Sequence, residues 1–254
     1  MLIAVIISRR AKKWGVAMSN HIHTIPVMDA LRDPKGCAFC VMQKKLETDV
    51  IQFILGPAYM EDDVRMETDK VGFCKEHLQA MYVQQNRLGL ALMLHTHIKK
   101  LCKDTGIIID GRMPIKLFGK DPAGVVPRLQ AHLVKTKESC YVCTRAEDTF
   151  ARYIDTFFYL WGKGGDDKKV IESQTSYCLP HFIELLATVE KMGRGMKEKC
   201  LDVLLPIWKN FTNELEGDLD WFVQKFDHRN ADQPWKNSKD VIPRAMGFLG
   251  GYDD

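Results

Sequence analysis

Eight cysteine and histidine residues recur in this sequence as two copies of one spaced pattern, and this repeat constrains the fold more than any other feature. Each copy is a Cys-x2-Cys pair followed, after 33 intervening residues in the first copy and 34 in the second, by a Cys-x2-His pair. The first copy consists of Cys37, Cys40, Cys74 and His77, and the second of Cys140, Cys143, Cys178 and His181. The copies are offset by 103 residues at the first pair and 104 at the second, which indicates an internal duplication.

Apolar positions around these pairs also match between the copies, for example Ile51 with Ile154 and Phe73 with Tyr177. Apolar residues at three- and four-residue intervals predict helices over 41–55 and 144–160, and the second pairs begin further helices over about 75–101 and 179–195. Only 106–110 has an extended pattern. We therefore predict an all-α fold of two pseudo-repeated helical hairpin modules, each clipped by a Cys3His metal site, plus a C-terminal amphipathic helix.

The same patterns divide the chain into five segments. Residues 1–17 are a disordered leader or follow a mis-assigned start, 18–103 form the first metal-binding repeat, and 104–137 connect the repeats with a short helix after Asp121 and Pro122. Residues 138–196 form the second repeat, and 197–254 the C-terminal helix and tail. Because proline lacks the N–H that a helix interior requires, Pro206 should kink or restart that helix.

The ligand types and their spacing predict two metal ions, most readily zinc. Two cysteines separated by two residues can bind one ion from a single turn, and a Cys and a His at i and i+3 project from one face at the start of a helix. Four protein ligands complete a tetrahedron without an open position, which is typical of structural zinc sites. We expect each repeat to complete its own site, although the sequence also permits pairing across the repeats.

Other uses of these residues remain open. Three thiolates and one further ligand can hold an iron–sulfur cluster, the main alternative to zinc. A redox disulfide requires a strand-helix context that neither Cys-x2-Cys pair has. Cys102 and Cys200 have no counterpart in the opposite copy, so we interpret both as core cysteines.

The remaining polar clusters give weaker signals. His21, His23, His95 and His97 are interpreted as surface or capping histidines, and the polar run 225–230 as a helix terminus.

Composition restricts the class of protein. The formal net charge is +3, and residues 1–17 contain four basic residues and no acid, so the remainder is close to neutral and predicts no nucleic-acid partner. No apolar run approaches the roughly 18 residues of a membrane span. The first residues do not follow the order of an export signal, and six of eight cysteines lie in metal-type pairs, which together predict a reducing, cytoplasmic location.

Five motifs in this sequence resemble an uncharacterised bacterial family that is catalogued as a domain of unknown function, over residues 18–250. They are Cys37-Ala-Phe-Cys40, Gly72-Phe-Cys74-Lys-Glu-His77, Cys140-Tyr-Val-Cys143, Tyr177-Cys178-Leu-Pro-His181 and Phe226-Asp-His-Arg229. Members of that family are sometimes labelled substrate-binding proteins of ABC transporters, but this chain lacks the export signal and lipid-attachment cysteine that such a protein needs. Ala38 and His228 depart from the family pattern, which has proline and tyrosine there. The resemblance implies the ligand set and no activity.

Two functions are compatible with these residues. In the first, the metals are structural in a cytoplasmic helical protein that binds a protein or small-molecule partner of unknown identity. In the second, the chain is a metal-dependent or iron–sulfur redox enzyme in which a site exchanges a ligand, with Cys102, Cys200, His95 and His228 as candidate participants. No phosphate-binding loop, Ser-His-Asp set or His-Glu-x-x-His motif is present, so the catalytic residues remain unknown and the sequence favours the first.

Overall fold

The computed structural model describes residues 20–33, 36–110 and 124–252, and within these residues the fold is all-α, as predicted. The elements in chain order are η1 (Asn20–His23), α2 (Thr24–Arg32), α3 (Ala38–Leu55), η2 (Pro57–Met60), α4 (Asp62–Val71), α5 (Lys75–Val83), α6 (Arg87–Asp110), α7 (Val125–Lys137), α8 (Tyr141–Lys163), α9 (Gly165–Glu172), α10 (Leu179–Val189), α11 (Arg194–Gln224), η3 (His228–Asn230) and α12 (Val241–Gly250). The predicted leader, 1–17, lies outside the described residues.

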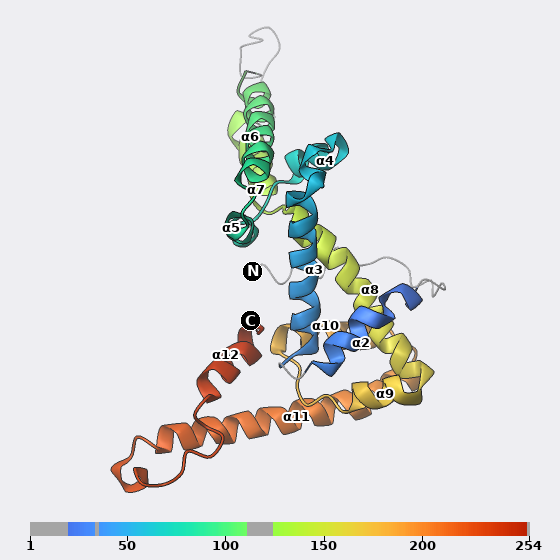
Figure 1. Cartoon of the computed structure of the whole chain (residues 1–254), viewed down its shortest axis with the longest axis vertical. Helices are drawn as coiled ribbons and strands as arrows, with labels where there is room; N and C mark the ends of the chain where they lie inside the picture. Colours follow the sequence, from blue (N-terminus) through green and yellow to red (C-terminus); the bar gives the residue numbers. More distant parts are fainter. Residues whose placement is uncertain (1–19, 34–35, 111–123, 253–254) are drawn as a thin grey trace.

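The duplication is visible in the order of the helices. In both repeats a long helix begins at a Cys-x2-Cys pair, a shorter helix with two acidic residues in its first turn follows, and a third helix begins at a Cys-x2-His pair. Helices α3, α4, α5 and α6 of the first repeat thus correspond to α8, α9, α10 and α11 of the second. The long fourth helices, α6 and α11, lie at opposite ends of the molecule (Figure 1).

Helices α3 and α8 form the centre of the molecule and run antiparallel. The start of α3 packs against the later part of α8, since the Phe39 ring lies 5.2 Å from that of Phe157. The end of α3, including Ile54, shares a second core cluster with Tyr141 and Val142 at the start of α8. Two separate core clusters therefore lie at the two ends of this helix pair, and a third, smaller cluster with Leu215, Val241 and Phe248 joins α11 to α12.

The second repeat is extended by the C-terminal helices. Phe182 of α10 stacks on Trp208 of α11 at 4.1 Å, and Trp208 also contacts Phe248 of α12. Helix α12 therefore turns back along α11 and reaches the beginning of α10 (Figure 1).

The helix predicted over 75–101 is interrupted, because α5 ends at Val83 and α6 begins at Arg87. Asn86 holds the break: its Oδ1 accepts from the N–H of Gly89 at 2.8 Å, as an N-cap does, and its Nδ2 donates to the Leu55 carbonyl at 2.6 Å. The short helix predicted in the connector is present as α7.

Two further local predictions need correction. Residues 106–110 are not extended but form the last turns of α6, because contacts between α6 and α7 outweigh the β propensity of three successive isoleucines. Helix α11 does not restart at Pro206 and continues as one helix, held by the burial of Leu204 and the stacking of Trp208 on either side.

Candidate metal centres

The eight predicted ligands come together in two groups of four, but each group contains residues of both repeats. Centre A consists of Cys37, Cys40, Cys178 and His181, and centre B consists of Cys74, His77, Cys140 and Cys143. In each group all four ligand atoms lie within 4.8 Å of one another. The prediction that each repeat completes its own site is therefore wrong, because each centre takes one ligand pair from 18–103 and one from 138–196.

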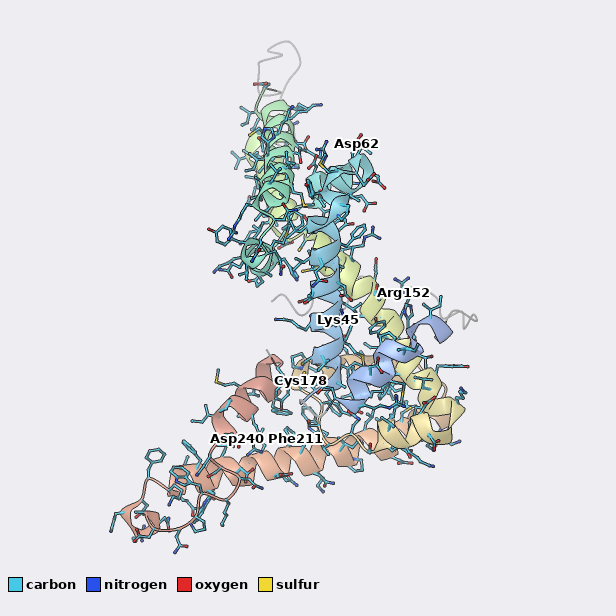
Figure 2. The ribbon with its side chains drawn as sticks, in the orientation of Figure 1. Lys45, Asp62, Arg152, Cys178, Phe211 and Asp240 are labelled. Atoms are coloured by element: carbon cyan, nitrogen blue, oxygen red, sulfur yellow. The ribbon has the colours of Figure 1, made fainter. Side chains whose placement is uncertain are left out.

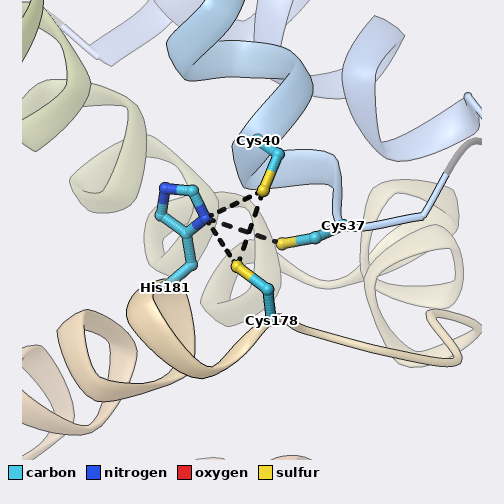
Figure 3. Close-up of side chains that lie close together, drawn as sticks. All are labelled: Cys37, Cys40, Cys178 and His181. Atoms are coloured by element: carbon cyan, nitrogen blue, oxygen red, sulfur yellow. Dashed lines mark hydrogen bonds between the residues drawn. The ribbon is translucent and has the colours of Figure 1, made fainter. Parts of the chain in front are cut away.

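Centre A is buried where α3 and α10 begin (Figure 3). His181 directs Nδ1 toward the thiols, at 3.0 Å from the Sγ of Cys178, 3.4 Å from that of Cys40 and 3.8 Å from that of Cys37. The Sγ atoms of Cys40 and Cys178 are 3.5 Å apart.

Centre B has the same arrangement where α5 and α8 begin. His77 Nδ1 lies 3.1 Å from the Sγ of Cys74, 3.4 Å from that of Cys140 and 3.3 Å from that of Cys143. The Sγ atoms of Cys74 and Cys143 are 3.9 Å apart.

The length and direction of α3 explain why the ligand pairs combine across the repeats. Eighteen helical residues carry the chain about 27 Å from Cys37, and the short helix α4 does not bring it back. The Cys74 pair is therefore placed beside the end of α3, where the antiparallel α8 begins. A bond of 2.9 Å from the Tyr141 N–H to the Gly72 carbonyl joins the two segments. Figure 2 shows the same separation, with Cys178 near the start of α3 and Asp62 near its end.

All four ligand pairs occupy the same positions at a helix start. Cys37, Cys74, Cys140 and Cys178 are the N-cap residues of α3, α5, α8 and α10, and the second ligand of each pair lies in the first turn. Two helix N-termini therefore meet at each centre. Their partial positive charges and free backbone N–H groups stabilise thiolates.

The distances between donor atoms fit a single tetrahedral ion. Zinc–sulfur bonds of about 2.3 Å and zinc–nitrogen bonds of about 2.0 Å place adjacent ligand atoms roughly 3.5 to 3.8 Å apart. The separations given above run from 3.0 to 3.9 Å, and all four ligand atoms of each centre lie within 4.8 Å of one another. Three soft thiol sulfurs and one imidazole nitrogen are also the donor set that structural zinc sites use.

Two residues of α3 that the sequence analysis did not identify contact the histidines from behind. Gln43 Oε1 lies 2.9 Å from His181 Nε2, and Glu47 Oε2 lies 3.5 Å from His77 Nε2. Gln43 also donates from Nε2 to Glu47 Oε1 at 3.0 Å. If both imidazoles donate from Nε2, each keeps the lone pair of Nδ1 directed at the thiols, which is the tautomer that metal binding requires. The i, i+4 spacing of a glutamine and a glutamate on a predicted helix was visible in the sequence, but it is a common surface pattern.

A third unforeseen contact comes from the C-terminal segment. The backbone N–H of Tyr252 donates to Cys40 Sγ at 3.3 Å, and the half-buried Tyr252 ring packs over Gly36 and Gly247. This segment covers centre A. No local pattern in the sequence signalled it, because the contact spans 212 positions.

The pKa values of the ligands reflect this crowding of thiols and imidazoles. Burial opposes protonation of His77, but hydrogen bonds to Cys140 and Glu47 raise its pKa to about 10. For His181, burial is outweighed by hydrogen bonds to Cys37 and Cys40, which raise its pKa to about 9. Hydrogen bonds from Cys143 and, against burial, from His77 lower the pKa of Cys140 to about 3. In centre A, hydrogen bonds from Cys178 and Cys40 likewise lower the pKa of Cys37. Without metal, these shifts favour an imidazolium paired with a thiolate in each centre.

The other candidate residues lie outside both centres. Cys102 is exposed on α6, so its interpretation as a core cysteine is wrong. Cys200 is buried in the core as predicted, and desolvation raises the pKa of its thiol to about 11. His95 is exposed, and the exposed His228 lies 3.3 Å from Asp227. Within the described residues, the only clusters suited to a metal are centres A and B.

The polar run 225–230 ends α11, in agreement with its interpretation as a helix terminus. Lys225 Nζ donates to the carbonyls of Asn230, Ala231 and Gln233 and so fixes the following turn. Asp227 caps η3 through the N–H of Arg229.

Across the described part of the chain, no helix combines the length and the hydropathy that crossing a membrane requires.

Comparison with known proteins gives one match. No curated protein and no solved structure matches the chain. Residues 18–254 match the model of a family of unknown function, DUF6062, and these residues include both centres and every contact described around them. The chain belongs to that family, DUF6062.

Proposed function

We propose that the chain binds two zinc ions, one in centre A and one in centre B, and that these ions fasten its two repeats to each other. The observation that carries this proposal is the convergence of eight ligands, from four helix starts, into two groups whose donor atoms each lie within 4.8 Å. Buried unpaired thiols alone would not require this arrangement at both ends of one helix pair.

Single-ion spacing favours zinc over an iron–sulfur cluster. In a cluster the protein ligands bind different irons, so their donor atoms lie further apart than ligands of one ion. Here the donor-atom separations given above are 3.0 to 3.9 Å and all lie within 4.8 Å, which is close to the edge length of one tetrahedron.

The proposed role of the ions is structural. Four protein ligands leave no open coordination position for a substrate. Each ion would also join residues far apart in sequence, such as Cys40 and Cys178, 138 positions apart, and so hold one end of the α3–α8 pair. Thiolate ligands persist in a reducing compartment, which agrees with a cytoplasmic location.

Because the proposed role of both ions is structural, we infer that the chain acts as a binding module. Many of its exposed large apolar side chains lie on α6 and α7 at one end and on α11, the following turn and α12 at the other, and the rest are spread over the other helices. Both ends project from the α3–α8 body in Figure 1. Apolar side chains gathered on projecting elements are typical of surfaces that contact another molecule.

Elemental analysis and X-ray absorption test the metal assignment together. Purified protein should carry two equivalents of zinc per chain. The extended fine structure of the zinc absorption spectrum should report three sulfur ligands and one nitrogen ligand per ion. Iron with inorganic sulfide, or sulfur-only coordination, would contradict the proposal.

A further inference from the structure

The internal duplication allows the two metal centres to be compared position by position. Centres A and B are built from equivalent residues of the two repeats, so any difference between them arose after the duplication. The clearest departure lies behind the two histidines. With the offset of 103 residues at the first pair, Glu47 of α3 corresponds to Phe150 of α8.

In centre A this position is apolar: the Phe150 ring lies 5.2 Å from the His181 ring, and Phe39 contacts the same imidazole at 6.0 Å. The polar group behind His181 is instead the neutral amide of Gln43, one turn earlier on α3. Both phenylalanines are buried. In centre B the same position carries the half-buried carboxylate of Glu47, which faces His77. Centre B therefore has a charged carboxylate beside its histidine, which favours hydration, whereas centre A has a neutral amide and two aromatic rings there.

The cysteines of centre A are also more deeply buried than those of centre B. Cys37 and Cys178 of centre A are fully buried, and the C-terminal segment covers Cys40 through the Tyr252 N–H. Centre B has two thiols, Cys74 and Cys143, that remain partly exposed. An external donor can therefore approach centre B without prior opening of the fold, whereas centre A is enclosed.

We propose that the two centres have different roles: centre A holds its ion permanently, and centre B exchanges a ligand with an external sulfur or nitrogen donor. This inference rests on the proposed binding of two zinc ions. In the exchange, Cys74 or Cys143 would leave the ion as the incoming donor gives it a lone pair, and the released thiolate would take a proton from the solvent. The ion remains divalent throughout.

The test uses the zinc-loaded wild-type chain and iodoacetamide. The thiolate sulfur attacks the carbon that bears iodide, a carbon–sulfur bond forms and iodide leaves, and the resulting thioether no longer binds zinc strongly. Zinc release is followed with the chromogenic chelator 4-(2-pyridylazo)resorcinol, and modified cysteines are identified by peptide mass spectrometry. Cys102, which is exposed and outside both centres, reports the rate of an accessible thiol.

We expect Cys74 and Cys143 to be modified together with the release of one equivalent of zinc, while Cys37, Cys40 and Cys178 stay protected and the second equivalent stays bound. Release of both ions at one rate, or earlier modification of the centre A cysteines, would overturn the inference while leaving two-zinc binding intact. Protein that carries no metal before treatment would instead contradict the proposed function.

A single substitution provides the converse test. Tyr252→Ala removes the ring that packs over Gly36 and Gly247, so it should uncover centre A and raise the rate of Cys40 modification several-fold without changing Cys74 and Cys143. Tyr82→Ala, at an exposed tyrosine on α5, is the matched control and should change neither centre. Equal rates for Cys40 in wild type and Tyr252→Ala would show that the C-terminal segment does not protect centre A.

Discussion

At the residue scale, each centre depends on a side chain that touches the histidine rather than on the four ligands alone. Glu47 contacts the outer nitrogen of His77 and can hold the imidazole in the tautomer that binds metal. Groups in this position also raise the basicity of the ligand, and their removal typically weakens metal binding about 10- to 100-fold.

Glu47→Ala should therefore weaken zinc binding at centre B by about tenfold and affect centre A much less, because Glu47 contacts His77 directly and reaches His181 only through Gln43. Alanine also preserves the helix propensity of α3. The measurement is a competitive zinc titration against a chelator of known affinity. Asp49→Ala serves as the control, since Asp49 lies two positions away on α3 and pairs with the exposed Lys45. Equal affinities for the Glu47 variant and the wild type would refute this role.

Zinc binding should also release protons, with a predictable dependence on pH. The pKa values of His77 and His181 are raised to about 10 and about 9, so both imidazoles are protonated in the metal-free protein at neutral pH. Metal must displace these protons as well as those of the thiols. Affinity should accordingly fall as pH is lowered and continue to rise up to about pH 9 at centre A and about pH 10 at centre B. Calorimetric titration in buffers of different ionisation enthalpy measures the release, and a heat independent of buffer would contradict it.

At the element scale, the helices and the ligand set could be predicted from the sequence because both are local. Periodic apolar residues identified α3, α8 and α10, and the Cys-x2-Cys and Cys-x2-His spacings identified all eight ligands. The pairing of those ligands could not be predicted, since it depends on the antiparallel packing of α3 and α8. Gln43, Glu47 and Tyr252 were missed for the same reason, because their partners lie in distant elements.

The break between α5 and α6 was missed because Asn86 acts through a partner 31 positions away, the carbonyl of Leu55. Asn86→Ala removes both this bond and the N-cap of α6, and should cost about 1–2 kcal/mol. For a chain of this size the melting temperature should fall by about 2–4 °C for each kcal/mol. Gln85→Ala, at the neighbouring position, is the control. A melting temperature equal to the control's would show that Asn86 does not hold the break.

At the scale of the whole molecule, the two ions would hold the two ends of the α3–α8 pair and thereby the two cores. Structural zinc contributes an apparent binding free energy of about 10–16 kcal/mol per ion, whereas the net stability of a domain is about 5–15 kcal/mol. A strong chelator should therefore abolish most of the helical circular dichroism in a cooperative transition, which added zinc reverses. A metal-free chain with undiminished helical signal would show that the ions are not structural.

The pairing of ligands across the repeats is the central claim, and the zinc content of two double variants tests it most directly. Cys74→Ser combined with Cys140→Ser disables one centre if pairing crosses the repeats and both centres if each repeat pairs within itself. Cys37→Ser combined with Cys74→Ser disables both centres if pairing crosses the repeats and one centre if each repeat pairs within itself. From the arrangement in centres A and B, we predict that the first double variant retains one equivalent of zinc and the second retains none. A second variant with one equivalent and a first with none would contradict the account.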